Sequence, residues 1–278
     1  MPIFLDRHEL GGMTAAEVAE AHMKDLEVQD RYGVKFLTYW FEEERGTGFC
    51  LIDAPDRATA ERVHREAHGN LPSDVIEVAL SAVEAFLGRI QDPRPGRSGR
   101  VEVDGGFRAI MFTDIVGSTE MTVRLGDRRA VELVRAHDAL VRRALAQCGG
   151  REVKHTGDGI MAAFDDVDAA LEAAEQIQRS FERYNRSSDE PIRVRIGLHA
   201  GEPVADSNDL FGSTVQLAAR LCAAAEAGGI MVSGVVAAAA RRRRRILEVG
   251  EQLLKGFSEP VRLFQVEWRD GGEPLPAR

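Results

Sequence analysis

Two aspartates stand at positions where chain folding would bring them to one end of a sheet. Asp114 closes the apolar stretch "RAIMFTD", and Asp158 lies in the turn between "REVKH" and "GIMAAF". A carboxylate at the end of a buried strand costs desolvation energy unless a cation or hydrogen-bond donors pair with it. If the strands are neighbours, the two carboxylates meet, and oxygen ligands at one point suit Mg²⁺ or Mn²⁺.

The segment after Asp114 indicates phosphate binding. Its sequence "IVGST" offers main-chain N–H groups at a turn that leads toward a helix. Two divalent ions about 3.5 to 4 Å apart are the usual means of in-line attack at phosphorus. Each motif alone has a structural alternative, a capped strand end for "FTD" and a simple turn for "GDG". The two motifs together favour metal-assisted phosphoryl chemistry.

Residues 107–268 resemble the catalytic domain of class III nucleotide cyclases, most closely the bacterial adenylate cyclases. The resemblance implies that Asp114 and Asp158 bind both metal ions, one activating the ribose 3′-hydroxyl and one holding the triphosphate, with the main chain of Ile115 assisting. It also places substrate contacts at Gly117, Ser118 and Thr119. The matching segments are "MFTDIVGST", "VKHTGDGIMAAF", "RVRIGLHAGE", "DLFGSTVQLAARL" and "LLKGFSEPVRLFQV".

Lys154 and Asp209 fall where this family places its purine-selecting pair. Adenine offers an amino donor at C6 and an acceptor at N1, whereas guanine reverses both. A Lys donor facing N1 and an Asp acceptor facing the amino group favour adenine. ATP is therefore the predicted substrate, and guanylate cyclase is the alternative.

Three further residues fall at positions of the family's catalytic pattern, and two of them match it. Arg220 matches the arginine that stabilises charge on the pentavalent phosphorus, a task suited to a fixed guanidinium. Lys255 matches the lysine that contacts the triphosphate. Gln216 departs from the pattern, which has Asn there, and misplacement by about an ångström can cost about 100-fold. Either activity is low, as in a nucleotide-binding regulatory protein, or the pocket has adapted to Gln.

The positions of Lys154 and Asp158 imply a dimer. They lie on opposite sides of a short turn, yet one should contact the base and the other the metals, at opposite ends of ATP. The resemblance implies a head-to-tail homodimer with two equivalent sites. In each site, Asp114 and Asp158 of one subunit would face Lys154, Asp209, Gln216, Arg220 and Lys255 of the other.

The chain divides by composition into two domains of mixed α and β structure. Residues 88–106 are rich in Gly and Arg and lack periodicity, which predicts a linker. Residues 1–87 predict strands and helices in the order βαββαβ, a ferredoxin-like domain, with a capping box at Thr14 and Glu17. Residues 107–278 predict a class III cyclase α/β sandwich with helices on one face of the sheet.

Four of the seven histidines, His8, His22, His64 and His68, lie in the first 68 residues. His64 and His68 are four residues apart on a predicted helix and can face one ion, and imidazole suits Ni, Cu, Zn or Co. Residues 1–79 also resemble small bacterial ferredoxin-like proteins described as nickel-binding. The four histidines are therefore a possible second metal site, with regulation of the cyclase through the linker. The alternative is a hydrogen-bonded polar cluster in a dimerisation domain.

Charge and composition restrict the partners. The net charge is −9, and residues 1–87 alone carry 17 acidic and 8 basic side chains, so nucleic acid and anionic lipid are disfavoured. The chain has no apolar run of about 18 residues and no recognisable signal peptide, and its three cysteines are odd in number. We expect a cytoplasmic protein with reduced thiols. The arginine run 241–245 is expected to be a solvated helix end.

Overall fold

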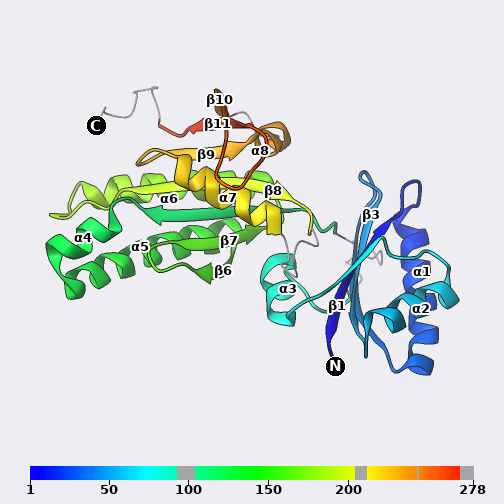
Figure 1. Ribbon diagram of the computed structural model, residues 1–278. Coiled ribbons are helices and arrows are strands. Elements are labelled where there is room, and N and C mark those ends of the chain that lie inside the picture. The colour runs from blue at the N-terminus through cyan, green and yellow to red at the C-terminus, as the bar shows by residue number, and fades with distance from the viewer. Residues whose placement is uncertain (93–103, 204–211, 243, 270–278) are drawn as a thin grey trace. The chain divides into compact units, whose positions relative to one another are not determined.

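The computed structural model describes residues 1–92, 104–203, 212–242 and 244–269 (Figure 1). The chain forms two units. The first comprises Met1–Phe107 with Glu202–Gly212, and the second comprises Arg108–Gly201 with Ser213–Arg278. Within the described ranges, no helix is long and apolar enough to cross a membrane. The three cysteines are free.

The first unit is a four-stranded antiparallel sheet in the order β2-β3-β1-β4, with helices between the strands. This confirms the expected ferredoxin-like plan. The elements are β1 (Ile3–Glu9), α1 (Ala15–Val28), a 3₁₀ turn (Gln29–Tyr32), β2 (Lys35–Glu42), β3 (Thr47–Asp53), α2 (Arg57–Ala67), β4 (Asp74–Glu77) and α3 (Leu80–Leu87).

Local chemistry explains where these helices begin and end. The capping box at the start of α1 is formed, because Thr14 accepts from the Glu17 N–H and Glu17 accepts from the Thr14 N–H. Asp56 caps α2 in the same way, accepting from the Thr59 N–H at 2.7 Å. Gly88, with φ of 83°, ends α3 in the left-handed conformation that glycine adopts without strain.

The second unit contains a seven-stranded sheet in the order β10-β11-β9-β8-β5-β7-β6. All neighbouring strands are antiparallel except β8 and β9. The elements are β5 (Arg108–Ile115), α4 (Ser118–Leu125), α5 (Asp127–Cys148), β6 (Arg151–His155), β7 (Ile160–Phe164), α6 (Val167–Asn185), β8 (Val194–Gly201), α7 (Gly212–Ala224), β9 (Ile230–Ser233), α8 (Gly234–Ala239), β10 (Arg245–Gln252) and β11 (Val261–Glu267).

Helices cover both faces of this sheet, so the expectation of helices on one face was wrong (Figure 1). Thr113 and Ile196 are paired on β5 and β8, and Thr113 contacts His137 of α5. Gly197, whose side of β8 is opposite to that of Ile196, lies against α7 so closely that a Cβ would come 2.1 Å from the Cys222 nitrogen. The glycine is therefore what allows α7 to pack on the second face.

The arginine run 241–245 is not simply a solvated helix end, which corrects that expectation. The Arg244 side chain is 8% exposed and pairs with Asp168 and Glu175 of α6 at 2.5 and 2.9 Å. Asp168 also accepts from the Arg241 N–H at 3.1 Å. Buried cations are found where carboxylates compensate them, so the run anchors the chain just before β10.

The partly buried histidine of β8 predicts a pH-dependent stability. Burial lowers the pKa of His199 to about 4, and its Nδ1 lies 2.7 Å from the Ser233 hydroxyl. The unfolded chain binds a proton between about pH 6.5 and 4 that the folded chain does not, so the unfolding free energy falls as pH drops through this window. We expect a loss on the order of 2 to 3 kcal/mol. Urea unfolding at pH 7 and at pH 4.5 measures this loss of unfolding free energy. The His199→Gln variant should lose less free energy between the two pH values than the wild type does. Equal losses in the two proteins would contradict the assignment to His199.

Candidate functional site

The fold brings Asp114 and Asp158 together. Asp114 lies at the end of β5, and Asp158 lies in the turn between β6 and β7, of which β7 pairs with β5. The Ile115 N–H donates to the Asp158 carbonyl at 3.1 Å. The turn approaches β5 closely because Gly159 has no side chain: a Cβ there would lie 1.9 Å from the Thr113 carbonyl oxygen.

The electrostatics of Asp114 favour a bound cation. Burial raises the pKa of Asp114, and the neighbouring Asp158 carboxylate raises it further, while an ion pair with Arg195 acts in the opposite direction. The net pKa is raised above the ordinary value for Asp. The carboxylate pair is therefore incompletely neutralised by the protein, and its oxygen donors are those that a hard divalent cation prefers.

Arg195 is a residue of the site that the sequence analysis did not single out. Its guanidinium nitrogens lie 2.6 Å from Asp114 Oδ2, and it also donates to the Ala223 carbonyl of α7 at 3.3 Å. The β5–β8 register places Arg195 directly opposite Asp114. A prediction of that strand pairing would have found it, since "RVRIGLHAGE" was already among the matching segments.

The turn after Asp114 has the features of an anion site. Gly117, with φ of 71°, is the N-cap of α4 and provides no side-chain cap. The first turn of α4 therefore presents main-chain N–H groups without a capping side chain, as phosphate-binding helix ends do. The Ser118 hydroxyl donates to the Asp158 carboxylate, and Thr119 is exposed in the same turn.

Two of the predicted nucleotide contacts, Lys154 and Lys255, lie at opposite edges of the sheet. Lys154 is exposed on β6 at one edge of the sheet, and Lys255 is exposed in the turn between β10 and β11 at the opposite edge. Asp209 lies outside the described residues.

Gln216 and Arg220 occupy the face of α7 that points away from the sheet. The buried residues Ala218, Cys222 and Ala225 mark the side of α7 that packs inward. At 100° per residue, Gln216 and Arg220 lie on the opposite side, and Gln216 is exposed. Their side chains are thus directed away from the sheet that carries Asp114 of the same chain.

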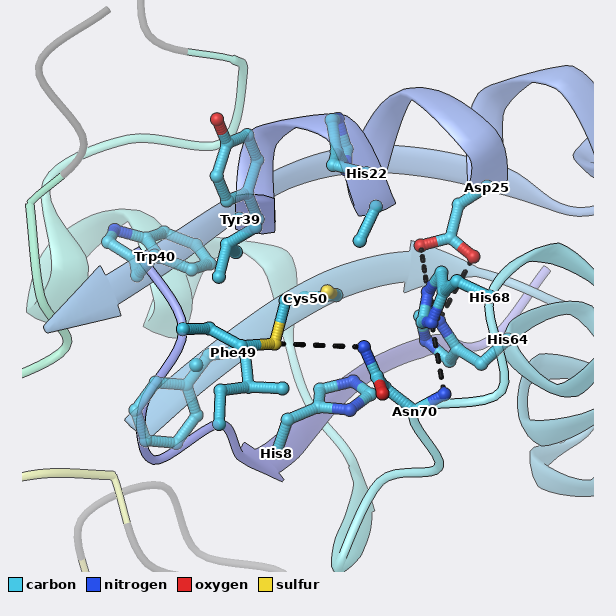
Figure 2. A pocket seen from close by; sticks show the side chains of 15 residues that line it. His8, His22, Asp25, Tyr39, Trp40, Phe49, Cys50, His64, His68 and Asn70 are labelled. Atoms are coloured by element: carbon cyan, nitrogen blue, oxygen red, sulfur yellow. Dashed lines mark hydrogen bonds and ion pairs between the residues drawn. The ribbon is translucent and has the colours of Figure 1, made fainter. Parts of the chain in front are cut away.

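The first unit contains a second cluster of possible ligands. Two groups have donor atoms within 4.8 Å of one another and share His64: one adds Asp6, His8 and Cys50, the other Asp25 and His68. All of them except Asp6 line a small pocket of about 30 Å³ together with apolar side chains. Figure 2 shows His64 and His68 meeting Asp25, with His8 and Cys50 among the other side chains that line the pocket.

A buried ion-pair network organises this cluster. His64 lies 2.8 Å from Asp6 and 3.1 Å from Asp25. Burial alone would lower the pKa of His64, but the charge of Asp6 and hydrogen bonds to both carboxylates raise it to about 10. His8 Nδ1, by contrast, is buried without a hydrogen-bond partner among the described residues. A buried imidazole nitrogen without a hydrogen-bond partner, on a histidine grouped with a thiol and a second imidazole, fits a transition-metal ligand.

Sequence reasoning identified part of this cluster. His64 lies in one group with His8 and in the other with His68, whereas among the described residues His22 belongs to neither group and bonds Asp92 at 3.1 Å. Asp6, Asp25 and Cys50 were missed as possible ligands. Asp6 is two residues before His8 on the same face of β1 and is paired with Cys50 on β3, so the strand register carried the signal.

The two units match two different families. Residues 107–267, more than half of the chain, match the family model of the adenylate and guanylate cyclase catalytic domain. Residues 4–78 match the family of the nickel responsive protein SCO4226-like.

Individual relatives agree with the first of these matches. An adenylate cyclase of Streptomyces coelicolor is 34% identical over 125 residues, covering 45% of this chain and 32% of the relative. One from Streptomyces griseus is 31% identical over 173 residues, covering 60% and 42%. The chain thus spans less than half the length of these relatives.

Solved structures share the fold of the second unit. Adenylate cyclases from Trypanosoma brucei are 25% identical, cover 60% of this chain and 91% of theirs, and superpose with a TM-score of 0.52. A guanylate cyclase domain from Catenaria anguillulae in complex with GTP is 21% identical, covers 59% and 98%, and gives a TM-score of 0.53. Because both kinds of cyclase share the fold, the fold does not select between the nucleotides.

Proposed function

Because the chain belongs to the family of adenylate and guanylate cyclase catalytic domains, we propose that it converts ATP to 3′,5′-cyclic AMP and pyrophosphate. The observation that carries this proposal is the convergence of Asp114 and Asp158 beside an uncapped helix N-terminus. In this reaction the ribose 3′-oxygen attacks the α-phosphorus in line, and pyrophosphate leaves.

The residues around the two aspartates divide this work. Asp114 and Asp158, assisted by the main chain of Ile115, would hold Mg²⁺ or Mn²⁺, which lowers the pKa of the 3′-hydroxyl and neutralises phosphate charge when bound. The raised pKa of Asp114, which comes first from burial and in smaller part from the Asp158 carboxylate, supports this assignment, because a divalent cation compensates a partly buried negative charge. The N–H groups of Gly117, Ser118 and Thr119 are placed to bind phosphate oxygens. Arg195, beside Asp114, adds a fixed guanidinium.

The orientation of α7 supports a homodimer. Gln216 and Arg220 point away from their own sheet, so they can serve an active site only across an interface. In a head-to-tail dimer each site would take its metal ligands from one subunit, and Gln216, Arg220 and Lys255 from the other. Arg220 would then stabilise the charge that develops on the α-phosphoryl group.

The substrate proposal makes Lys154 the residue that selects ATP, together with Asp209. We expect Lys154→Glu to lower kcat/KM for ATP by 10- to 100-fold, because the variant removes a donor to adenine N1, worth about 1 to 3 kcal/mol, and places an acceptor there. The ratio of the ATP and GTP rates measures the effect. Lys24→Glu, which changes charge equally on the exposed surface of α1, is the control. An unchanged ratio would remove Lys154 from base selection.

The main proposal is tested by incubating the purified full chain with ATP or GTP and Mn²⁺ and separating the products by chromatography. Cyclic AMP from ATP, at a rate well above that of cyclic GMP from GTP, is the expected result. Preferential cyclic GMP formation would instead make the protein a guanylate cyclase. Nucleotide binding without a cyclic product would leave a regulatory nucleotide-binding protein.

We further propose that the first unit binds Ni²⁺ or a similar transition metal. The orphaned His8 Nδ1 supports this, with the Cys50 thiolate as a soft donor and Asp6 as an oxygen donor. His64 could join them only by releasing its proton, because a metal ligand must be a neutral imidazole. Residues at the start of the linker contact the pocket side chains, so metal binding could affect the cyclase domain through the linker. His22, on the pocket wall, pairs with Asp92, and Arg89 lies over the Trp40 ring at 4.7 Å.

Nickel is expected to stabilise the protein through this pocket. At 100 times the dissociation constant, binding adds about 2.7 kcal/mol to the unfolding free energy, whereas Mg²⁺ should add little, because imidazole and thiolate ligands disfavour it. His8→Ala should lose most of the nickel effect. Thermal unfolding with each metal measures this, and the rate of cyclic AMP formation with and without nickel tests the coupling. Absence of bound nickel after challenge would exclude the site.

A further inference from the structure

A chain of hydrogen bonds, buried at Thr113, His137 and Asp138 and exposed at His155 and Gly157, connects the residue before Asp114 with the residue before Asp158. It starts on β5, passes through α5 and ends in the turn between β6 and β7. We call it the aspartate tether, and its members are Thr113, His137, Asp138, His155 and Gly157.

On the β5 side, the tether starts at a buried hydroxyl. Thr113 Oγ1 accepts from the Ile160 N–H at 3.0 Å and lies 3.3 Å from His137 Nε2. His137 is fully buried, and its Nδ1 lies 3.0 Å from Asp138 Oδ1. The residue adjoining Asp114 is thereby fixed to α5 through side chains alone.

On the turn side, the same carboxylate holds a second imidazole. Asp138 Oδ2 lies 2.9 Å from His155 Nε2, and His155 Nδ1 accepts from the Gly157 N–H at 3.2 Å. Asp138 is 8% exposed. The residue adjoining Asp158 is thereby fixed to the same point on α5.

The donors and acceptors of the tether are mutually consistent. Since His155 Nδ1 accepts from Gly157, its proton lies on Nε2 and is donated to Asp138. His137 likewise donates from Nδ1 to Asp138, which leaves Nε2 to accept from the Thr113 hydroxyl. Both imidazoles are then neutral. The Asp138 carboxylate receives one donor from each imidazole and also lies 3.5 Å from Arg142 Nη1, so no buried polar group of the tether lacks a partner.

We propose that His137, Asp138 and His155 are positioning residues that fix the separation of Asp114 and Asp158 and so set the affinity for the catalytic metal ions. The inference rests on the proposed function, in which those two aspartates hold the ions. Supporting residues behind metal ligands commonly change affinity by about 10- to 100-fold. A carboxylate pair held at the correct spacing binds without the cost of ordering the turn.

The decisive variant is Asp138→Asn. Its amide has only one acceptor for the two imidazole donors and turns an N–H group toward one of them. We expect the dissociation constant for Mn²⁺, measured from the free-Mn²⁺ electron paramagnetic resonance signal with a non-hydrolysable ATP analogue, to rise about 10-fold. The kcat at saturating Mn²⁺ should change less than the Mn²⁺ concentration that gives half-maximal rate.

A second pair of variants addresses folding defects. Thr113→Val removes the buried hydroxyl at nearly constant volume, and Thr113→Ser retains it. The valine variant should weaken Mn²⁺ binding, and the serine variant should restore most of the affinity. Asp166→Ala, which removes the N-cap of α6, is the control for general destabilisation and should bind Mn²⁺ as the wild type does.

The outcomes separate the two proposals. If the wild type makes cyclic AMP and both Asp138→Asn and Thr113→Val bind Mn²⁺ as tightly as the wild type does, the positioning role is overturned and the proposed function stands. Absence of Mn²⁺ binding by the wild type with the ATP analogue would overturn the proposed function and, with it, the tether's role. Equal weakening by Asp166→Ala would show a stability effect and also overturn the positioning role.

Discussion

Replacing Asp158 with asparagine should reduce cyclic AMP formation by about 1,000-fold or more. The amide has one oxygen and no charge, so the variant loses several kcal/mol of metal-dependent stabilisation of the transition state, and about 4 kcal/mol corresponds to 1,000-fold. Asp114→Asn should have a similar effect. Product formation at saturating Mn²⁺ and ATP measures both.

The free energy of unfolding is not expected to fall with the activity. Asp158 raises the pKa of Asp114, so removing its charge relieves repulsion, and Asp158→Asn should be at least as stable as the wild type without metal. Asp166→Asn is the matched control, because asparagine caps a helix about as well as aspartate does. Cyclic AMP formation within a few-fold of the wild type by Asp158→Asn would contradict the metal assignment.

Mixing two inactive variants should restore activity. Asp158→Asn lacks a metal ligand, and Arg220→Ala lacks the guanidinium expected to act from the partner subunit, where removal of a transition-state donor typically costs about 100- to 1,000-fold. In a head-to-tail dimer, a heterodimer of the two has one site with both defects and one intact site.

The expected recovery follows from random pairing. Equal amounts of the two variants that exchange subunits form heterodimers as about half of all dimers, each with one of two sites intact, so about a quarter of the wild-type activity returns. Rates measured before and after mixing, at constant total protein, give the result. Recovery of no activity after demonstrated subunit exchange would place Asp158 and Arg220 in the same site of one chain.

The sequence was sufficient to predict the convergence of Asp114 and Asp158. Apolar strands on both sides of the "TGDG" turn predict a hairpin. Pairing of this hairpin with β5 is then enough to bring Asp158 to Asp114. Arg195 was missed because its role depends on the register between β5 and β8, which the separate segments do not reveal. The second helical face was missed because it depends on the close approach of α7 to Gly197, and a glycine within a strand pattern does not reveal which helix packs on it.

Compensation between distant charges was also invisible in the sequence. A run of arginines is typical of a solvated segment, and only the fold shows that Asp168 and Glu175, about 70 residues earlier, surround Arg244. In the first unit, helical spacing predicted that His64 and His68 lie together, but their carboxylate partners come from β1 and α1. Such partners depend on tertiary packing, which local spacing does not encode.

Crystals of the full chain grown with Mn²⁺ and a non-hydrolysable ATP analogue would test the central claim directly through anomalous scattering from manganese. We expect two peaks about 3.5 to 4 Å apart. Both should contact Asp114 and Asp158, and the adenine should lie against Lys154 of the partner subunit. Peaks distant from these carboxylates, or an adenine bound by Lys154 of the same chain, would contradict the account.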